Sequence, residues 1–161
     1  MRLDEITEVL KNKFKHKIKG KVRFHEVDSF GVVHNLAYLY WFEIAQTDYF
    51  ENLGFKITPM TFISDFPLMK VHNEIDYFLP LRLGDEYFVH TRISLIKNTS
   101  FEYQNLICDV QNQIVAFGKS TLVYLNPKNF EPVPLPTRFR DLVRNFERED
   151  VEQLQELNGP K

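Results

Sequence analysis

The sequence is poor in the features that mark secreted, membrane-spanning or nucleic-acid-binding proteins. Its 161 residues include one cysteine, Cys108, so no internal disulfide can form and a reducing, cytoplasmic compartment is expected. The chain has 20 Lys and Arg residues against 22 Asp and Glu, so it lacks the excess of positive charge that binds the phosphate backbone of a nucleic acid. The longest apolar run, residues 36–42, falls well short of the ~20 residues of a membrane helix, and the N-terminal segment has no signal-peptide core. We therefore expect a soluble protein with neither a nucleic-acid partner nor a transmembrane segment.

Metal-ligand patterns and internal repeats are also missing. The five histidines are scattered, and none pairs with another histidine or with Cys108 at the spacing of a zinc site. No segment repeats at a fixed period. Four prolines between positions 127 and 136 end the evenly composed part of the chain. The expected organisation is one domain over residues 1–136, whose first 16 residues form a helical extension, followed by a helical tail over 137–161, with no metal.

Alternation of apolar and polar residues predicts an antiparallel sheet. The pattern is plain in residues 87–95, where it places Tyr87 and Leu95 on the same face. Short polar turns near residues 97–98 and 111–112 connect the later strands and leave no room for crossover helices. The expected strands cover residues 17–27, 68–79, 85–97, 99–110 and 113–126, and helices are expected over 3–13 and 137–157.

Residues 36–52 change to a helical period and predict one long helix. Its apolar stripe is formed by Tyr38, Phe42, Ala45 and Tyr49, widened by Trp41 and Ile44. Asn35 is a favoured N-cap residue, and Gly54 suits the left-handed position after a helix. Because the helix is apolar around most of its circumference, we expect it to be wrapped by other elements rather than to lie on a surface.

One long apolar helix combined with about five antiparallel strands predicts an α+β hot-dog fold, in which a curved sheet wraps a single central helix. A sheet of this kind leaves one edge and the mouth of the helix groove open. We expect a second copy of the chain to close them, which predicts a homodimer or a homotetramer.

The segment between the first strand and the long helix carries the most informative chemistry. It places a carboxylate, Asp28, before Gly31 and a helix start near Asn35. Free backbone N–H groups at a helix start can stabilise a developing oxyanion. A carboxylate beside them can attack a thioester carbonyl or activate water. From its residues alone, Asp28 is better explained as a loop or capping carboxylate, because structural ion pairs also use such positions, and catalysis is the second interpretation.

Residues 28–50 read DxxGVVxxxxYxxWFExAxTxYF, a pattern that resembles the signature of the 4-hydroxybenzoyl-CoA thioesterase family. The segment is similar in particular to the branch of short acyl-CoA thioesterases encoded beside the Tol-Pal envelope system. Residues 73–93 resemble the second and third strands of that family, and residues 122–136 resemble its last strand and exit. The resemblance implies a thioester hydrolase that converts an acyl-CoA to free acid and CoA, with no cofactor other than the CoA of the substrate.

The resemblance also implies roles for individual residues. Asp28 is the implied catalytic carboxylate, acting as nucleophile or general base. The backbone N–H of Asn35 is the implied oxyanion donor, and Gly31 allows the tight approach of the loop. Tyr38 is the implied aromatic wall over the acyl group.

Three further positions are candidates for substrate binding. His34 precedes the helix and is either a second acid/base group or an ordinary half-buried loop histidine. Lys97 and Thr99 belong to a polar turn that lies near the CoA phosphates in the family, or else form a solvated hairpin. Two departures from the branch stand out, because many of its members carry His at the position of Asn35 and Arg at that of Gln46.

The leading prediction is an acyl-CoA thioesterase whose site is shared across a dimer. A thioester of acyl carrier protein is a close variant of the substrate. An acyl-CoA binding or regulatory module without turnover is the non-enzymatic alternative, because a fold alone does not decide function. A hot-dog hydratase or dehydratase is a weaker alternative, since the usual His-centred motif of those enzymes is absent.

Overall fold

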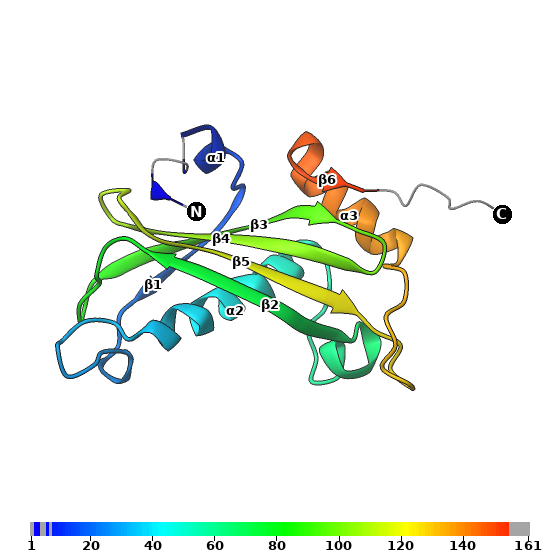
Figure 1. Cartoon of the computed structure of the whole chain (residues 1–161), viewed down its shortest axis with the longest axis horizontal. Helices are drawn as coiled ribbons and strands as arrows, with labels where there is room; N and C mark the ends of the chain where they lie inside the picture. The colour runs from blue at the N-terminus through cyan, green and yellow to red at the C-terminus, as the bar shows by residue number, and fades with distance from the viewer. Residues whose placement is uncertain (1, 4–5, 7, 155–161) are drawn as a thin grey trace.

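The structure, a computed structural model, describes residues 2–3, 6 and 8–154. The long helix α2 (Asn35–Asn52) lies along one face of an antiparallel sheet (Figure 1). The five long strands are β1 (His16–Lys21), β2 (Leu68–Tyr77), β3 (Glu86–Ile96), β4 (Ser100–Asp109) and β5 (Ile114–Tyr124). They follow the order β1-β3-β4-β5-β2, and a short strand, β6 (Glu152–Gln153), pairs in parallel with the end of β3. This arrangement confirms the predicted hot-dog fold.

The first strand is shorter than predicted. We expected it to continue to Val27, but β1 ends at Lys21 and residues 24–26 form a 3-10 turn. The carboxylate of Glu26 stabilises this turn by accepting the backbone N–H of Arg23 at 2.8 Å and the indole N–H of Trp41 at 2.9 Å. The turn therefore depends on a contact with α2 that strand alternation does not reveal. The other four strands end within two residues of the predicted bounds.

The alternation in β3 is confirmed up to Ile93 and is wrong after it. A register shift against β4 falls between Ile93 and Leu95, as expected for a β-bulge. Ile96 consequently points into the core and is fully buried, whereas Leu95 is half-buried. One extra residue in the strand is enough to exchange the two faces.

Helix α2 begins at Asn35, and its N-cap is His34 rather than the predicted Asn35. The backbone of His34 is extended, at φ −73° and ψ 151°, and its carbonyl accepts the N–H of Ala37 at 3.0 Å. The predicted left-handed residue after the helix is confirmed, because Gly54 has φ +97°.

The packing of α2 departs from the prediction on one side. Most apolar side chains of the helix are buried against the sheet, but Leu36, Tyr40 and Ile44 are 53%, 63% and 59% exposed. These three residues are four positions apart and form one stripe on the helix surface. We name them the α2 stripe. In a single chain, therefore, the sheet covers only part of the helix.

The terminal helices are shorter than predicted. Within the predicted helix 3–13, the described helix α1 covers Glu8–Asn12, and residues 4, 5 and 7 lie outside the described part. Helix α3 (Thr137–Glu147) ends early because Arg148 adopts a positive φ of 58°; residues 155–157 of the predicted helix are not among those described. No helix among the described residues is long and apolar enough to cross a membrane.

Gly118 lies where the sheet closely approaches Phe42 of α2. A Cβ atom at this position would lie 2.5 Å from the ring of Phe42 and 2.9 Å from the carbonyl oxygen of Glu74. We expect Gly118→Ala to lower the free energy of unfolding by about 1–3 kcal/mol in urea titrations, because the added methyl group overpacks the interface. Trimming the ring in the double variant Gly118→Ala/Phe42→Leu should make the two effects less than additive. Strictly additive effects would contradict this interpretation.

Candidate active site

Asp28 lies at the base of a tight loop between the 24–26 turn and α2. Its N–H donates to the carbonyl of Val32 at 2.8 Å, and its own carbonyl accepts the N–H of Gly31 at 3.0 Å. Gly31 has φ +73°, which few other residues adopt without strain. Val27 pairs with Val33, which directs the loop back to the helix start.

The Asp28 carboxylate points into its own loop in the single chain. One of its oxygens, Oδ1, accepts the N–H of Phe30 at 2.8 Å and that of Val32 at 3.4 Å. The side chain is exposed, and no cation pairs with it among the residues that the structure describes. It therefore remains accessible to solvent or to a ligand while serving as a loop cap, and the geometry is compatible with both sequence interpretations.

The start of α2 offers free backbone donors. The first N–H groups of a helix have no intrahelical partner, and the N–H of Asn35 finds none elsewhere in the described part of the chain. The positive end of the helix dipole adds to their attraction for negative charge. Asn35 also has its carbonyl held by the hydroxyl of Tyr77, which donates at 3.2 Å. Beside these donors, an oxyanion could be bound without any help from the Asn35 side chain.

A groove of about 290 Å³ opens beside this helix start. It is lined by Val32, Val33, Asn35 and Tyr38 and by the four residues that end and follow β2, Tyr77, Phe78, Leu79 and Pro80. Tyr38 is buried, and its ring packs edge-on against that of Tyr77 with centroids 5.1 Å apart. Burial raises the pKa of Tyr38 to about 12, so its hydroxyl stays neutral. The structure thus brings Tyr38 and Asn35 together in one apolar groove; we did not anticipate the segment 77–80.

His34 is half-buried and connects the loop to the helix. Its backbone N–H donates to the carbonyl of Glu26 at 3.0 Å, and its carbonyl caps α2. The side chain does not line the groove beside Asn35. A backbone role therefore accounts for its position.

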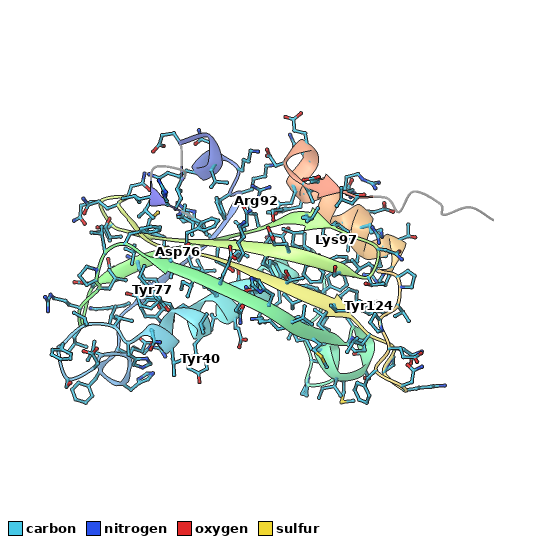
Figure 2. All side chains as sticks on the ribbon, in the orientation of Figure 1. Tyr40, Asp76, Tyr77, Arg92, Lys97 and Tyr124 are labelled. Carbon is cyan, nitrogen blue, oxygen red and sulfur yellow. The ribbon has the colours of Figure 1, made fainter. Side chains whose placement is uncertain are left out.

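Lys97 and Thr99 lie elsewhere in the chain. They belong to the turn between β3 and β4. Ile96, directly before this turn, belongs to the core cluster that contains Tyr49 and Phe50. This cluster packs at the C-terminal end of α2, a helix whose length of 18 residues corresponds to roughly 27 Å. Figure 2 shows Tyr77 and Lys97 at opposite ends of the molecule. Within one chain, the structure does not bring them to the groove at Asn35.

A second cavity, of about 250 Å³, opens between α2 and β2 farther along the helix. Gln46 on its rim donates to Asn105 at 2.8 Å, and Asn105 donates to Thr91 at the same distance. The sequence drew attention to Gln46 only as a departure from the family pattern. Nothing in the sequence indicated that distant segments would meet it there.

The described residues contain no cluster of three or more His, Cys, Asp or Glu side chains that could hold a metal ion. Of the scattered histidines, His16 is buried, and its ring nitrogen is 2.7 Å from a carboxylate oxygen of Asp48. His90 is half-buried against Phe14, and burial lowers its pKa to about 4. The contacts of His16 and His90 are therefore those of residues that stabilise the fold.

The fold is that of a thioesterase-type hot-dog domain. The profile of the Thioesterase-like superfamily matches residues 22–143, and the chain belongs to this superfamily. Similar proteins are named thioesterases or CoA hydrolases, and the chain is accordingly a thioester hydrolase. Membership in the superfamily does not by itself assign the roles of Asp28 or Asn35.

Three similar proteins illustrate the range of the superfamily. The chain is 29% identical over 133 residues to the acyl-acyl carrier protein thioesterase ATL2, chloroplastic, of Arabidopsis thaliana, covering 82% of this chain and 70% of that protein. It is 27% identical over 131 residues to the 1,4-dihydroxy-2-naphthoyl-CoA hydrolase of Rippkaea orientalis, covering 80% and 95%. The structure of a thioesterase from Thermus thermophilus, complexed with coenzyme A and Zn, superposes with a TM-score of 0.71 at 29% identity, covering 84% and 96%.

Proposed function

We propose that this chain hydrolyses an acyl-CoA thioester to a free acid and CoA, with Asp28 as nucleophile or general base. The observation that carries the proposal is the free N–H of Asn35 beside an apolar groove, at the end of the loop that holds Asp28. The relatives support CoA as the carrier, since one is named a CoA hydrolase and another was solved with coenzyme A. The single buried cysteine is consistent with a cytoplasmic setting.

The proposed reaction uses the two ends of the 28–35 segment together. The carboxylate of Asp28 attacks the thioester carbonyl carbon or removes a proton from the water that attacks it. The carbonyl oxygen gains negative charge, which the Asn35 N–H and the helix dipole stabilise. The carbon–sulfur bond then breaks, and CoA leaves as a thiolate that takes up a proton. Direct attack leaves an anhydride on Asp28, which water hydrolyses to release the acid.

We further propose that a second copy of the chain completes the site. The α2 stripe leaves three large apolar side chains exposed, and Met69 and Val71 are exposed on β2, an edge strand of the sheet. Lys97 and Thr99 do not reach the groove of their own chain. In the assembly they would instead meet the CoA phosphates at the site of a neighbouring chain.

A charge placed in the α2 stripe tests the second copy. We expect Ile44→Glu to convert a dimer or tetramer to a monomer in size-exclusion chromatography with light scattering, since a buried unpaired carboxylate is unfavourable. Thioester hydrolysis should fall at least about tenfold with the loss of assembly. Val110→Glu is the matched control, because Val110 is similarly exposed but lies at the β4–β5 turn. A wild-type protein that hydrolyses thioesters as a monomer would overturn this proposal.

Thiol release from a panel of short, long and aromatic acyl-CoAs tests the function itself. Acyl carrier protein thioesters belong in the same panel, because the ATL2 relative is named for that carrier. Tight binding without thiol release from any thioester would instead favour an acyl-CoA binding module.

A further inference from the structure

The cavity midway along α2 is a separate hollow that the proposed reaction does not use. Its floor is largely apolar, and its walls come from α2, from the segment before β2, and from three strands. The lining residues are Glu43, Gln46, Thr47, Phe50, Phe62, Leu68, Lys70, Tyr103 and Leu122. We name it the distal cavity.

The charged groups at the rim of the distal cavity neutralise one another. The ammonium of Lys70 lies 3.0 Å from the carboxylate of Glu43 and donates to the amide oxygen of Gln46 at 3.4 Å. Gln46 in turn donates to Asn105. These bonds join α2 to β2 and leave no rim charge unpaired for an ionic ligand. The cavity therefore favours an apolar ligand.

One polar atom of the lining has no partner. The side chain of Tyr103 is 1% exposed, and its hydroxyl makes no hydrogen bond within the described part of the chain. A buried unpaired hydroxyl is unfavourable by about 1–3 kcal/mol. Its presence on the wall indicates a space that is not optimised as closed protein core.

The distal cavity and the groove at Asn35 lie on the same seam between α2 and β2. Tyr77 contacts Asn35 at one end of the seam, and Lys70 contacts Gln46 at the other. The 11 residues from Asn35 to Gln46 span roughly 16 Å along the helix axis. Between them, Leu39 and Ile75 are half-buried hydrophobic residues packed against the core. The seam thus has an apolar floor along its length.

We propose that the distal cavity receives the far end of a straight-chain acyl group whose thioester lies at Asn35. This inference rests on the proposed function and makes long-chain linear acyl thioesters the substrate class. A butanoyl or a single-ring aroyl group is too short to cover roughly 16 Å of helix and would leave the distal cavity empty. A linear chain that reaches the cavity would add apolar burial with each methylene.

Chain-length preference is the measurement that tests the inference. For the wild type, kcat/KM should rise from butanoyl-CoA to tetradecanoyl-CoA by up to about fourfold per added methylene, as expected from buried apolar area. Leu68→Trp, which fills the distal cavity, should lower the tetradecanoyl-to-butanoyl ratio of kcat/KM at least about tenfold. Phe62→Ala, which enlarges the cavity at a partly exposed position, should move the optimum to longer chains.

Leu83→Trp is the matched control, because Leu83 is an exposed leucine outside both cavities. The kcat/KM ratio for long and short acyl-CoA is compared in Leu83→Trp, Leu68→Trp and Phe62→Ala. If all three ratios stay within twofold of the wild-type ratio while hydrolysis persists, the inference is wrong and the proposed function stands. If no thioester is hydrolysed, the proposed function fails, and the ratio of the binding affinities of tetradecanoyl-CoA and butanoyl-CoA decides instead. The same affinity ratio in wild type and in Leu68→Trp would then overturn the inference.

Discussion

The Asp28→Asn variant should lose thioester hydrolysis while keeping its fold. If Asp28 attacks the thioester or activates water, an amide in its place should lower kcat about 10²–10⁴-fold. The amide oxygen of Asn can still accept the N–H groups of Phe30 and Val32, so the loop should persist. Thiol release measures the first effect. A thermal melt measures the second, and Tm should change by no more than a few degrees.

Asp109 provides a closely matched control for Asp28. Its Oδ1 accepts the N–H groups of Gln111 and Gln113, two and four positions on, which repeats the bonding pattern of Asp28 in another loop. Asp109→Asn should therefore report the effect of altering such a loop cap without touching the site. Equal activity in the two variants, or a large drop in Tm for Asp28→Asn, would identify Asp28 as a structural loop residue.

Glu147→Ala should produce a large loss of stability although Glu147 lies outside the site. Glu147 is fully buried at the end of α3, and its Oε1 accepts the hydroxyl of Tyr49 at 2.6 Å and the N–H of Ile93 at 3.1 Å. Removing the carboxylate leaves both donors buried without partners. We expect the free energy of unfolding to fall by about 3 kcal/mol or more in urea titrations. Because Tyr49 belongs to α2 and Ile93 to β3, this loss would show that α3 stabilises the core.

Two further variants sharpen the Glu147 prediction. Glu147→Gln retains an acceptor oxygen for Tyr49 and Ile93 and should lower stability less than Ala does. Asp141→Ala is the control on the same helix, because Asp141 forms only an exposed ion pair with Arg144 and should change stability by less than about 0.5 kcal/mol. A Glu147→Ala variant as stable as Asp141→Ala would contradict a structural role for the buried carboxylate.

The Glu147 contribution should also depend on pH. Burial raises the pKa of the folded-state carboxyl above its ordinary value of 4.5. The folded state then binds a proton at Glu147 more readily than the unfolded state does. This group therefore adds stability as the pH falls from the folded-state pKa toward 4.5 and withdraws it as the pH rises. Unfolding free energies of wild type and Glu147→Gln across this window should differ in slope, and parallel curves would refute the assignment.

Much of the fold could be predicted because its elements follow local periods. The alternation of residues 113–126 and the helical spacing of 36–52 each appear within a few neighbouring positions, and both elements were confirmed. The failures occurred where a distant contact or a backbone irregularity intervenes. Glu26 turns the chain by bonding Trp41, and a bulge after Ile93 reverses the faces of β3. Neither event leaves a periodic trace.

The candidate site divides in the same way. Asp28, Gly31 and Asn35 are neighbours in sequence, so a loop between a strand and a helix was enough to predict their association. The groove wall is formed by Tyr77 to Pro80, and the rim of the distal cavity by Lys70; all of these residues belong to β2 or follow it. They are more than 20 positions in sequence from the α2 residues that they meet, such as Gln46. Their contact depends on the register of β2 against β5 and on the direction of α2 across the sheet.

The order of polar and apolar residues by itself determined the kind, number and approximate limits of the main elements, and it placed Asp28 in the loop before α2. Only the tertiary structure decided which side of α2 stays uncovered, that Lys97 and Thr99 do not line the groove at Asn35 in one chain, and that both hollows lie between α2 and β2. Secondary structure depends on steric and hydrogen-bonding preferences over a few residues. The hollows arise where side chains from separate elements meet, and their positions depend on strand register and helix packing over the whole chain.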